Sequence, residues 1–209
     1  MTYNEILDLA KGHVQQIKRC LLACTMEQIQ KFFTSFIGQM VWQVRRGHGS
    51  FLTMEFGAPH LSVREPIVPN PDTCGSVRRN LQRRHVDITG DWHFWVQYGE
   101  WRLPTDDGAL TSDDSPGTPF DECLRDLEGQ RLVAVEPGTR ERSCAFSFDL
   151  GGSLEIWPSI EIPDDQWSLY SVGGDIVTCD NNGALVFEKA DLEQPIYKPL
   201  DVTWPRGAA

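Results

Sequence analysis

The first 36 residues carry apolar positions at the spacing of two amphipathic helices. In the first helix these positions recur at three- and four-residue steps, with charged and amide side chains between them. The run Thr25-Met26-Glu27-Gln28 has the form of a capping box and predicts the start of a second helix, which Gly38 ends. The two apolar stripes are Ile6, Leu9, Ala10, Val14, Ile17 and Leu21, and then Ile29, Phe32, Phe33 and Phe36. We therefore expect an N-terminal helical segment, residues 1–36.

From Gly38 onward apolar and polar residues alternate, which is typical of half-buried strands. Short connections that contain glycine separate these runs, as in the hairpins of an antiparallel meander. We expect such hairpin turns at residues 47–49, 57–60 and 151–152. The alternating apolar residues are Trp42, Val44, Leu52, Met54, Phe56, Leu61 and Val63, and later Val133, Val135, Phe146, Phe148, Leu150, Leu154 and Ile156. The pattern predicts a mainly β protein, α+β overall once the helices are counted.

One stretch of the chain recurs 75 residues later without a gap. Residues 92–110, WHFWVQYGEWRLPTDDGAL, align with residues 167–185, WSLYSVGGDIVTCDNNGAL. Upstream, Gly38-Gln39 aligns with Gly129-Gln130 if the turns between strands differ slightly in length. Glycine, tryptophan and turn residues in the same order indicate a tandem duplication of one antiparallel β-meander. Each copy is too small to close a large core alone, so we expect the two to bury apolar faces against each other.

The duplication divides the chain into successive parts. After the helical segment we expect β unit 1 at residues 37–111, an acidic linker at 112–126, β unit 2 at 127–189 and an extended C-terminal tail at 190–209. The sequence leaves open whether the two units form one closed barrel or two packed sheets.

The two units differ in two places. Asn182-Gly183 and Asp107-Gly108 predict a last hairpin in each unit, since both dipeptides tolerate positive φ, but the first unit has no evident closing strand. Unit 1 also contains an insertion at residues 66–90 that opens with three prolines and carries four arginines. Long insertions in compact domains are usually functional or disordered, so we expect a long loop here.

Composition and charge narrow the classes of function. The 209 residues are 40% hydrophobic and include seven Trp, which is a globular composition. Residues 103–209 hold 21 Asp and Glu against 7 Lys and Arg, a net charge of −14, whereas residues 1–102 hold 9 against 12, a net charge of +3. An acidic body repels nucleic acids and anionic membranes and attracts basic partners. We expect a protein partner with a basic surface and no membrane; simple solubility is the alternative explanation of the charge.

The sequence has neither a signal peptide nor a run of 18 apolar residues, so we expect a cytoplasmic protein. The cysteines form no C-x-x-C pair and have no histidine partners at zinc-binding spacing, which leaves a metal site without support. In a reducing compartment they are expected to be buried or idle thiols. They are Cys20, Cys24, Cys74, Cys123, Cys144 and Cys179.

Catalytic and cofactor signatures are absent from the sequence. It contains no Gly-x-Ser-x-Gly elbow, no phosphate-binding Gly-x-x-x-x-Gly-Lys loop, no His-Glu-x-x-His and no dinucleotide fingerprint. We therefore name no catalytic residue, metal ligand or cofactor, and we expect binding rather than catalysis. A dispersed site remains an alternative, in which His48 and His60 of two predicted turns could converge.

Trp95 and Tyr170 occupy equivalent positions in the two aligned stretches, on the face of the strand opposite to Trp92 and Phe94. Two explanations fit aromatic residues there. They make an internal contact between the units, or they form an exposed platform for a partner, because Trp and Tyr dominate interface hot spots.

Charged residues supply the other candidate contacts. Arg78, Arg79, Arg83 and Arg84 could follow nucleic-acid phosphates, but the segment lacks aromatic residues for base stacking. We expect them instead to dock on the protein's own acidic unit or on an acidic partner. Acidic side chains of unit 2 are candidate contacts for a basic partner: Asp164, Asp165 and Asp175.

The acidic charge and the duplicated β units resemble those of small, acidic, β-rich bacterial proteins of the toxin-immunity type. That resemblance implies a non-catalytic cytosolic binding protein that neutralises a basic partner such as a toxin. The alternative is a small-ligand binder or enzyme whose pocket lies at the seam between the units, lined by Trp95, Tyr170 and loop histidines. The oligomeric state is left open.

Overall fold

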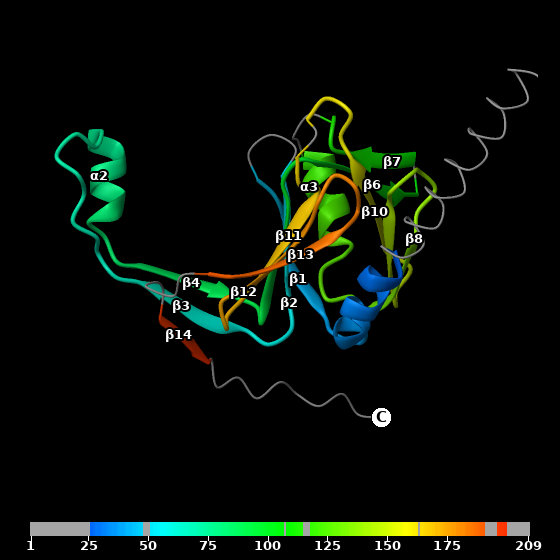
Figure 1. Ribbon diagram of the computed structural model, residues 1–209, viewed down its shortest axis with the longest axis horizontal. Helices are drawn as coiled ribbons and strands as arrows, with labels where there is room; N and C mark the ends of the chain where they lie inside the picture. The colour runs from blue at the N-terminus through cyan, green and yellow to red at the C-terminus, as the bar shows by residue number, and fades with distance from the viewer. Residues whose placement is uncertain are drawn as a thin grey trace, which may run out of the picture.

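The computed structural model describes residues 26–47, 51–106, 108–114, 118–162, 164–190 and 196–199. The protein is mainly β, as the alternating pattern predicts, with two large sheets and one small one (Figure 1). The six-stranded sheet has the order β1 (Val41–Arg46), β2 (Leu52–Phe56), β5 (Trp92–Val96), β11 (Trp167–Ser171), β12 (Asp175–Cys179) and β13 (Leu185–Lys189). The five-stranded sheet has the order β7 (Gly108–Thr111), β6 (Gly99–Thr105), β10 (Ser153–Pro158), β9 (Cys144–Phe148) and β8 (Leu132–Pro137).

The two large sheets pack against each other around one apolar core. Phe94 of the six-stranded sheet meets Phe146 of the five-stranded sheet with ring centroids 5.6 Å apart. Residues 26–33 are helical and continue into the short 3-10 helix η1 (Thr34–Phe36), as predicted. Phe33 of this segment contacts both Phe146 and Trp167, so the aromatic stripe of the helix seals one end of the core. The helix predicted nearer the N-terminus lies outside the described residues.

The two sheets are joined by backbone hydrogen bonds where β1 and β8 begin. Val41 N donates to Gln130 O and Leu132 N donates to Gln39 O, at 2.9 and 3.0 Å. An isolated antiparallel bridge between Met40 and Arg131 lies between these bonds. The core is therefore continuous from one sheet to the other along this seam.

Strands from both predicted units enter both large sheets. Unit 1 contributes β1, β2 and β5 to the six-stranded sheet and β6 and β7 to the five-stranded one, while unit 2 contributes three strands to each. The pairing also differs, because β2 pairs with β5 whereas β9 pairs with β10. Trp92 is half-buried and Trp167 fully buried, although both rings pack on the segment that holds Phe33 and Phe36. The duplication itself stays a prediction.

The predicted loop 66–90 is part of a long hairpin that leaves the body as an arm (Figure 1). β2 runs on into β3 (His60–Arg64), and β4 (His85–Thr89) runs on into β5, so β3 and β4 extend the pairing of β2 with β5. The short helix α2 (Gly75–Leu81) lies at the end of the arm. The C-terminal tail contributes β14 (Ile196–Pro199), which pairs with β3 and completes a three-stranded sheet.

Residues 57–60 are therefore a bend in a long strand, and the hairpin predicted there is wrong. Gly57 has φ +82°, and a side chain at Gly90 would meet the carbonyl oxygen of Phe56 at 2.4 Å. These two glycines let the paired strands bend together at the root of the arm. A turn and a bend need the same residue types, which is why the local sequence was misleading.

Two further predictions for the segment after β6 are wrong. The first unit does keep a closing strand, because β7 pairs with β6 from Thr105 opposite Gly108 to Arg102 opposite Thr111. The predicted acidic linker contains the helix α3 (Thr118–Arg125), which packs on β1. Leu124 and Leu127 are 2% and 1% exposed, so a few buried leucines hold this charged segment on the core. The predicted hairpins at 151–152 and 182–183 are present, and β1 pairs with β2 across the predicted turn at 47–49, whose residues 48 and 49 lie outside the described residues.

Candidate functional site

The outer face of the six-stranded sheet, opposite to the core, carries a row of chemically distinctive side chains. Glu55 of β2 and Tyr170 of β11 both pair with His93 of β5, so the three residues lie side by side across three strands. Trp95 follows His93 on the same face by strand alternation. A recess of about 340 Å³ opens here. Its walls are Thr89, His93, Trp95, Tyr170, Ser171 and Val172.

Trp95 and Tyr170 contact each other, as one of the two predicted explanations requires. Their ring centroids are 6.3 Å apart with the planes inclined by 42°, and His93 lies at the same distance from Tyr170. Gln97 Nε2 donates to the Tyr170 hydroxyl at 3.2 Å. Both aromatic residues are only half-buried, so the contact leaves ring surface open to solvent. Strand pairing between β5 and β11 thus produces an aromatic platform from two stretches that are remote in sequence.

Glu55 is a buried carboxylate that holds His93 in place. Its side chain is 7% exposed, and Oε1 lies 2.6 Å from His93 Nδ1. Oε2 accepts hydrogen bonds from Thr89 Oγ1 at 3.1 Å and from Gly90 N at 2.8 Å. A buried carboxylate requires such partners, because burial without them costs several kcal/mol (on the order of 2–7 for a polar group). The imidazole is thereby oriented beside the aromatic platform, and the recess gains a polar group in a fixed position.

A second histidine and carboxylate pair lies at the root of the arm. His60 Nε2 is 2.6 Å from Asp91 Oδ1, and Asp91 Oδ2 accepts from Ala58 N at 2.7 Å. Asp91, which lies between β4 and β5, therefore ties the bend in its own strand to the bend at Ala58 in the other strand. Glu55 of β2 makes the corresponding link to Gly90. His60, one of the two histidines of the alternative dispersed site, is part of this structural clamp, and His48 lies outside the described residues.

The four arginines of the insertion lie at the end of the arm, away from the recess. Arg84 forms an ion pair with Glu65 at 2.8 Å, and the pKa of its guanidinium is raised by hydrogen bonding to that carboxylate. Arg78 donates to backbone carbonyl oxygens of the same loop. Arg79 and Arg83 are exposed and make no side-chain hydrogen bond or ion pair with the residues that the structure describes. Within the described residues the predicted docking on the acidic unit 2 is not found, because the arm carries the arginines away from that unit; docking on an acidic partner stays a prediction.

The predicted acidic residues lie on the body. Asp164 and Asp165 precede β11, and the pKa of Asp165 is raised by partial burial and by the charges of Asp164, Asp180 and Glu188. These four carboxylates therefore form one acidic cluster beside the hairpin of β12 and β13. Asp175 is not part of it, since its carboxylate pairs with Lys189.

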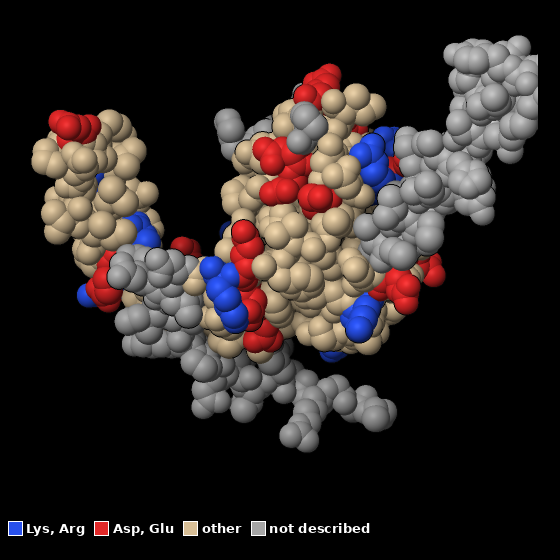
Figure 2. All heavy atoms as spheres, in the orientation of Figure 1, with Lys and Arg blue, Asp and Glu red and all other residues tan. Residues whose placement is uncertain are grey.

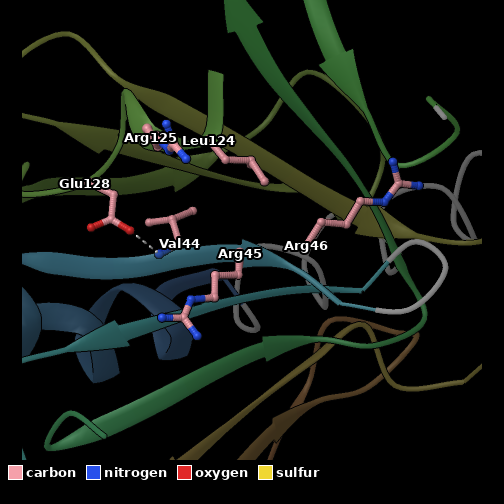
Figure 3. Close-up of a pocket in the computed structure, with 6 residues that line it drawn as sticks. All are labelled: Val44, Arg45, Arg46, Leu124, Arg125 and Glu128. Carbon is pink, nitrogen blue, oxygen red and sulfur yellow. Dashed lines mark hydrogen bonds between the residues drawn. The ribbon is translucent and has the colours of Figure 1, made fainter. Parts of the chain in front are cut away.

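A further recess of about 290 Å³ lies between β1 and α3, and Figure 3 shows its charged lining. Glu128 Oε1 accepts from Val44 N at 3.0 Å, which ties the turn after α3 to the irregular part of β1. The guanidinium groups of Arg45, Arg46 and Arg125 point in different directions (Figure 3), and Arg46 donates to carbonyl oxygens after β7. Three diverging cations do not form one anion site, so we assign this recess a packing role.

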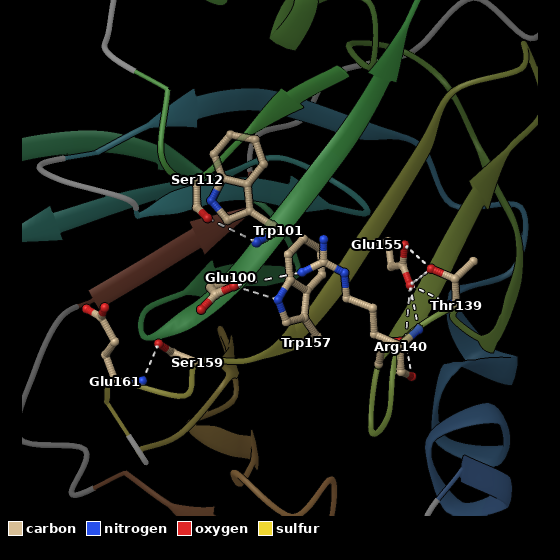
Figure 4. A network of polar contacts seen from close by, with 10 residues as sticks. Glu100, Trp101, Ser112, Thr139, Arg140, Glu155, Trp157, Ser159 and Glu161 are labelled. Carbon is tan, nitrogen blue, oxygen red and sulfur yellow. Dashed lines mark hydrogen bonds and ion pairs between the residues drawn. The ribbon is translucent and has the colours of Figure 1, made fainter. Parts of the chain in front are cut away.

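Figure 4 shows a polar network on the outer face of the five-stranded sheet. Trp157 Nε1 donates to Glu100 Oε2 at 2.6 Å, and the Arg140 guanidinium stacks 3.6 Å above the Trp157 ring. Cation–π stacking and the hydrogen bond together fix the indole against the sheet. Because Trp157 is 7% exposed, the network covers the ring and leaves little of it for a ligand.

Glu155 organises the turn between β8 and β9 in the same network (Figure 4). Its carboxylate accepts from the Thr139 hydroxyl at 2.8 Å, from Ser143 Oγ at 3.1 Å and from Arg140 N at 3.3 Å. Partial burial alone would raise the pKa of Glu155, but hydrogen bonds from Thr139, Ser143 and Arg140 outweigh it and the pKa is lowered. The role of this carboxylate is therefore structural.

The recess is thus the feature of the described surface with the clearest capacity to bind. The sequence pointed to Trp95 and Tyr170 through the repeat, but it did not single out His93 or Glu55, whose only signal is strand alternation beside the aromatic residues. Within the described residues, no group of three or more His, Cys, Asp or Glu has the arrangement of a metal site. None of the helices in that part of the chain is long and apolar enough to cross a membrane. Comparison with known proteins finds no matching family, no matching curated protein and no matching solved structure.

Proposed function

We propose that this protein is a non-catalytic binding protein that holds a basic partner protein on the outer face of the six-stranded sheet. The observation that carries the proposal is the recess, where Trp95, Tyr170 and the Glu55-held His93 meet at the centre of that face. Partly exposed Trp and Tyr side chains on a rigid sheet are typical anchors of interfaces. The volume of about 340 Å³ is at the lower end of the range of ligand pockets, roughly 300–1,000 Å³, so the recess has room for an inserted side chain.

A cationic side chain is the occupant that the chemistry favours. Aromatic faces attract Lys and Arg, with about 0.5–2 kcal/mol per contact. The buried carboxylate of Glu55 lies beside His93, and the acidic cluster around Asp165 lies on the same sheet. The net charge of −14 in residues 103–209 would also steer a basic partner toward the protein.

Neutralisation of a basic toxin by an immunity-type protein is one specific form of this proposal. An inhibitor of that kind needs only to cover the partner's active site, so it requires no chemistry of its own. A reducing, cytoplasmic location belongs to the same proposal and is supported by the free thiols of Cys144 and Cys179, both buried.

The recess provides a direct test. A short Arg- and Lys-rich peptide and a matched Asp- and Glu-rich peptide would be titrated into the protein while the Trp95 indole resonance is followed by NMR. We expect the basic peptide to shift this resonance, with weaker binding at 0.5 M salt, and the acidic peptide to leave it unchanged. Equal shifts with both peptides, or none with either, would refute the proposal.

A paired substitution identifies the natural partner. The variant W95A/Y170A and the control variant L150A, whose side chain is 76% exposed in the turn between β9 and β10, would each be immobilised beside the wild type. We expect one basic protein to be retained from a lysate of the source cells by the wild type and by L150A, and to be lost with W95A/Y170A. Equal retention of that protein by the immobilised wild type, L150A and W95A/Y170A would contradict binding at the recess.

A small-molecule ligand is the second candidate function. The recess combines an aromatic wall with three polar side chains, Thr89, His93 and Ser171, and its location between β5 and β11 is the seam between the two predicted units. Mixed apolar and polar linings of this size also bind small ligands. Native mass spectrometry of freshly purified protein would detect a co-purified small molecule in the wild type, and its absence from W95A/Y170A would place it in the recess.

A further inference from the structure

The arm has an apolar face that the rest of the described chain does not cover. In its sheet Leu61 pairs with Ile88 and Val63 with Val86, so these four side chains share one face. Val86 and Ile88 are 54% and 45% exposed, and α2 at the end of the arm has no buried residue. A small three-stranded sheet that buries so little of itself gains stability chiefly from something that covers it.

The same arm carries positive charge. Residues 66–89 contain four Arg against two Asp, in a protein whose net charge is −11. Arg79 and Arg83 have no carboxylate partner among the described residues. The surface that fits the arm must therefore be apolar and acidic at once.

The acidic end of the body has this combination of properties. The cluster of Asp164, Asp165, Asp180 and Glu188 is accompanied by exposed apolar side chains. Those side chains are Ile160, Ile162 and Val186, which are 94%, 48% and 44% exposed. Two surfaces of opposite charge, the arm and the acidic end, thus each combine charge with exposed large hydrophobic residues; other exposed hydrophobic residues of the described chain, such as Leu150 and Phe187, lie elsewhere.

The two surfaces do not meet within one chain. Figure 2 shows an open notch between the arm and the body, with acidic residues gathered on the part of the body across the notch. The arm is held in this position at its root by Glu55 and Asp91, which bridge the bends in both strands. Contact between the two surfaces therefore requires a second molecule.

We infer that the protein forms a two-fold symmetric dimer in which the arm of each protomer lies on the acidic end of the other. Reciprocal contacts of this kind are the usual form of a homodimer, because each surface is present once on each copy. The apolar side chains of the arm would be buried, and Arg79 and Arg83 would meet the cluster around Asp165. The dimer contacts leave out the recess on which the proposed function rests, and the two proposals share only the acidic cluster around Asp165.

Complementary charge reversal tests the dimer. The variant R79E/R83E makes the arm acidic, and the variant D164R/D165R makes the opposite surface basic. Each variant alone places like charges at both contacts, and we expect the dissociation constant of its dimer to rise at least about 100-fold, because like-charge contacts cost several kcal/mol. An equimolar mixture places opposite charges at both contacts, and we expect it to form a 1:1 heterodimer.

Sedimentation velocity and multi-angle light scattering would measure these masses between about 1 and 100 μM at low and high salt, with circular dichroism to verify that each variant folds. A wild type that remains monomeric throughout this range would overturn the inference. So would a dimer that both variants leave intact, because that dimer would use another surface. The variant W95A/Y170A serves as the control: we expect it to dimerise like the wild type whether or not it has lost the partner.

Discussion

Phe94 and Leu169 are direct partners in the antiparallel pairing of β5 with β11, at the centre of the six-stranded sheet. They are also the two positions that the 75-residue repeat equates. The bridge between Met40 and Arg131 has the same property, since both residues directly follow the aligned Gly-Gln pairs. Contacts between equivalent positions are what a two-fold axis between related halves would produce. A duplication would produce such contacts, and it remains a prediction.

Truncation at this central pair should be costly. Phe94 is 1% exposed and touches Phe56, Phe146 and Trp167. We expect Phe94→Ala to lower the free energy of unfolding by about 3–5 kcal/mol, through lost burial and the cavity that remains. Chemical denaturation would measure the change, and the exposed Leu150→Ala should stay within about 0.5 kcal/mol of the wild type. A loss below about 1 kcal/mol for Phe94→Ala would mean that the core is not centred here.

The bend at the root of the arm should depend on two glycines for different reasons. A Cβ at Gly90 would meet the backbone oxygen of Phe56 at 2.4 Å, whereas a Cβ at Gly57 would meet the Asp91 side chain at 2.3 Å. We expect both alanine variants to lose more than about 1 kcal/mol of stability, because neither site accepts a side chain without strain. Asp91→Ala should restore part of the stability lost in Gly57→Ala, because it removes the side chain that the new Cβ would meet. It should restore none in Gly90→Ala, where the Cβ meets the backbone oxygen of Phe56.

Thermal unfolding of the single and double variants would measure this difference. Gly173→Ala is the matched control, because its nearest neighbours to a Cβ lie at 3.5 Å and it needs no positive φ. If Gly173→Ala were as destabilising as Gly90→Ala, the close approach at the bend would not be the cause.

Glu155 should make stability depend on pH in the acid range. Its pKa is lowered in the folded protein, so its contribution is present above the ordinary pKa of 4.5 and is lost as the pH falls through the folded-state pKa. We expect Glu155→Gln to lose about 1 kcal/mol at pH 7, a value reduced by solvent screening, and to approach the wild type at acid pH. Urea denaturation from pH 7 down to pH 3 would show this convergence. Parallel curves across the range would contradict the role of the carboxylate.

Asp165 should have the opposite effect. Its pKa is raised by partial burial and by neighbouring carboxylates, so its ionised form weakens the folded state above the folded-state pKa. We expect Asp165→Asn to be more stable than the wild type at pH 7 by less than about 1 kcal/mol, since the cluster is partly solvated. The gain should vanish below the ordinary pKa of 3.8 and shrink in high salt. Melting temperatures at a concentration too low for self-association would measure it.

The thiols should differ strongly in reactivity. Cys74 is exposed, and hydrogen bonding to Ser76 lowers its pKa, whereas burial raises the pKa of Cys144 to about 12 and that of Cys179 well above 9.0. We expect iodoacetamide at pH 8 to alkylate Cys74 at least about 100-fold faster than Cys144 or Cys179, because only the thiolate reacts. Peptide mapping by mass spectrometry would follow each site. Equal rates in the folded protein would contradict the burial of Cys144.

Much of the secondary structure could be predicted because it depends on local patterns. Alternation predicted the strands around Met54, Phe94 and Phe146, and Asn182-Gly183 predicted a hairpin, since both signals act over a few residues. The aromatic platform was also within reach, because the repeat placed Trp95 and Tyr170 on the same face. What local patterns could not provide was the strand order, which depends on partners far apart in the chain.

The wrong predictions of a hairpin at Gly57 and of an acidic linker share one cause. The sequence around Gly57 suits a turn, and the acidic segment before Leu124 suits a linker, so each was assigned from its own residues. In the structure β4 runs on into β5 and pairs with β3, so the strand that begins with β2 continues past Gly57. The buried side chains of Leu124 and Leu127 hold α3 and the turn after it on the core. Tertiary contacts therefore decided between local conformations that differ little in energy.

Local sequence patterns are sufficient for the mainly β class, the helix over residues 26–36, the final hairpin and the acidic charge of residues 103–209. These properties follow from periodicity, turn chemistry and composition, which a linear chain already contains. Two further features depend on tertiary contacts: His93 meets Glu55 and Tyr170, and the four arginines lie on an arm away from the acidic cluster. The physical reason is that sheet pairing is non-local: which strand binds which depends on the burial and hydrogen bonding of the whole core, and the site exists only once that pairing has formed.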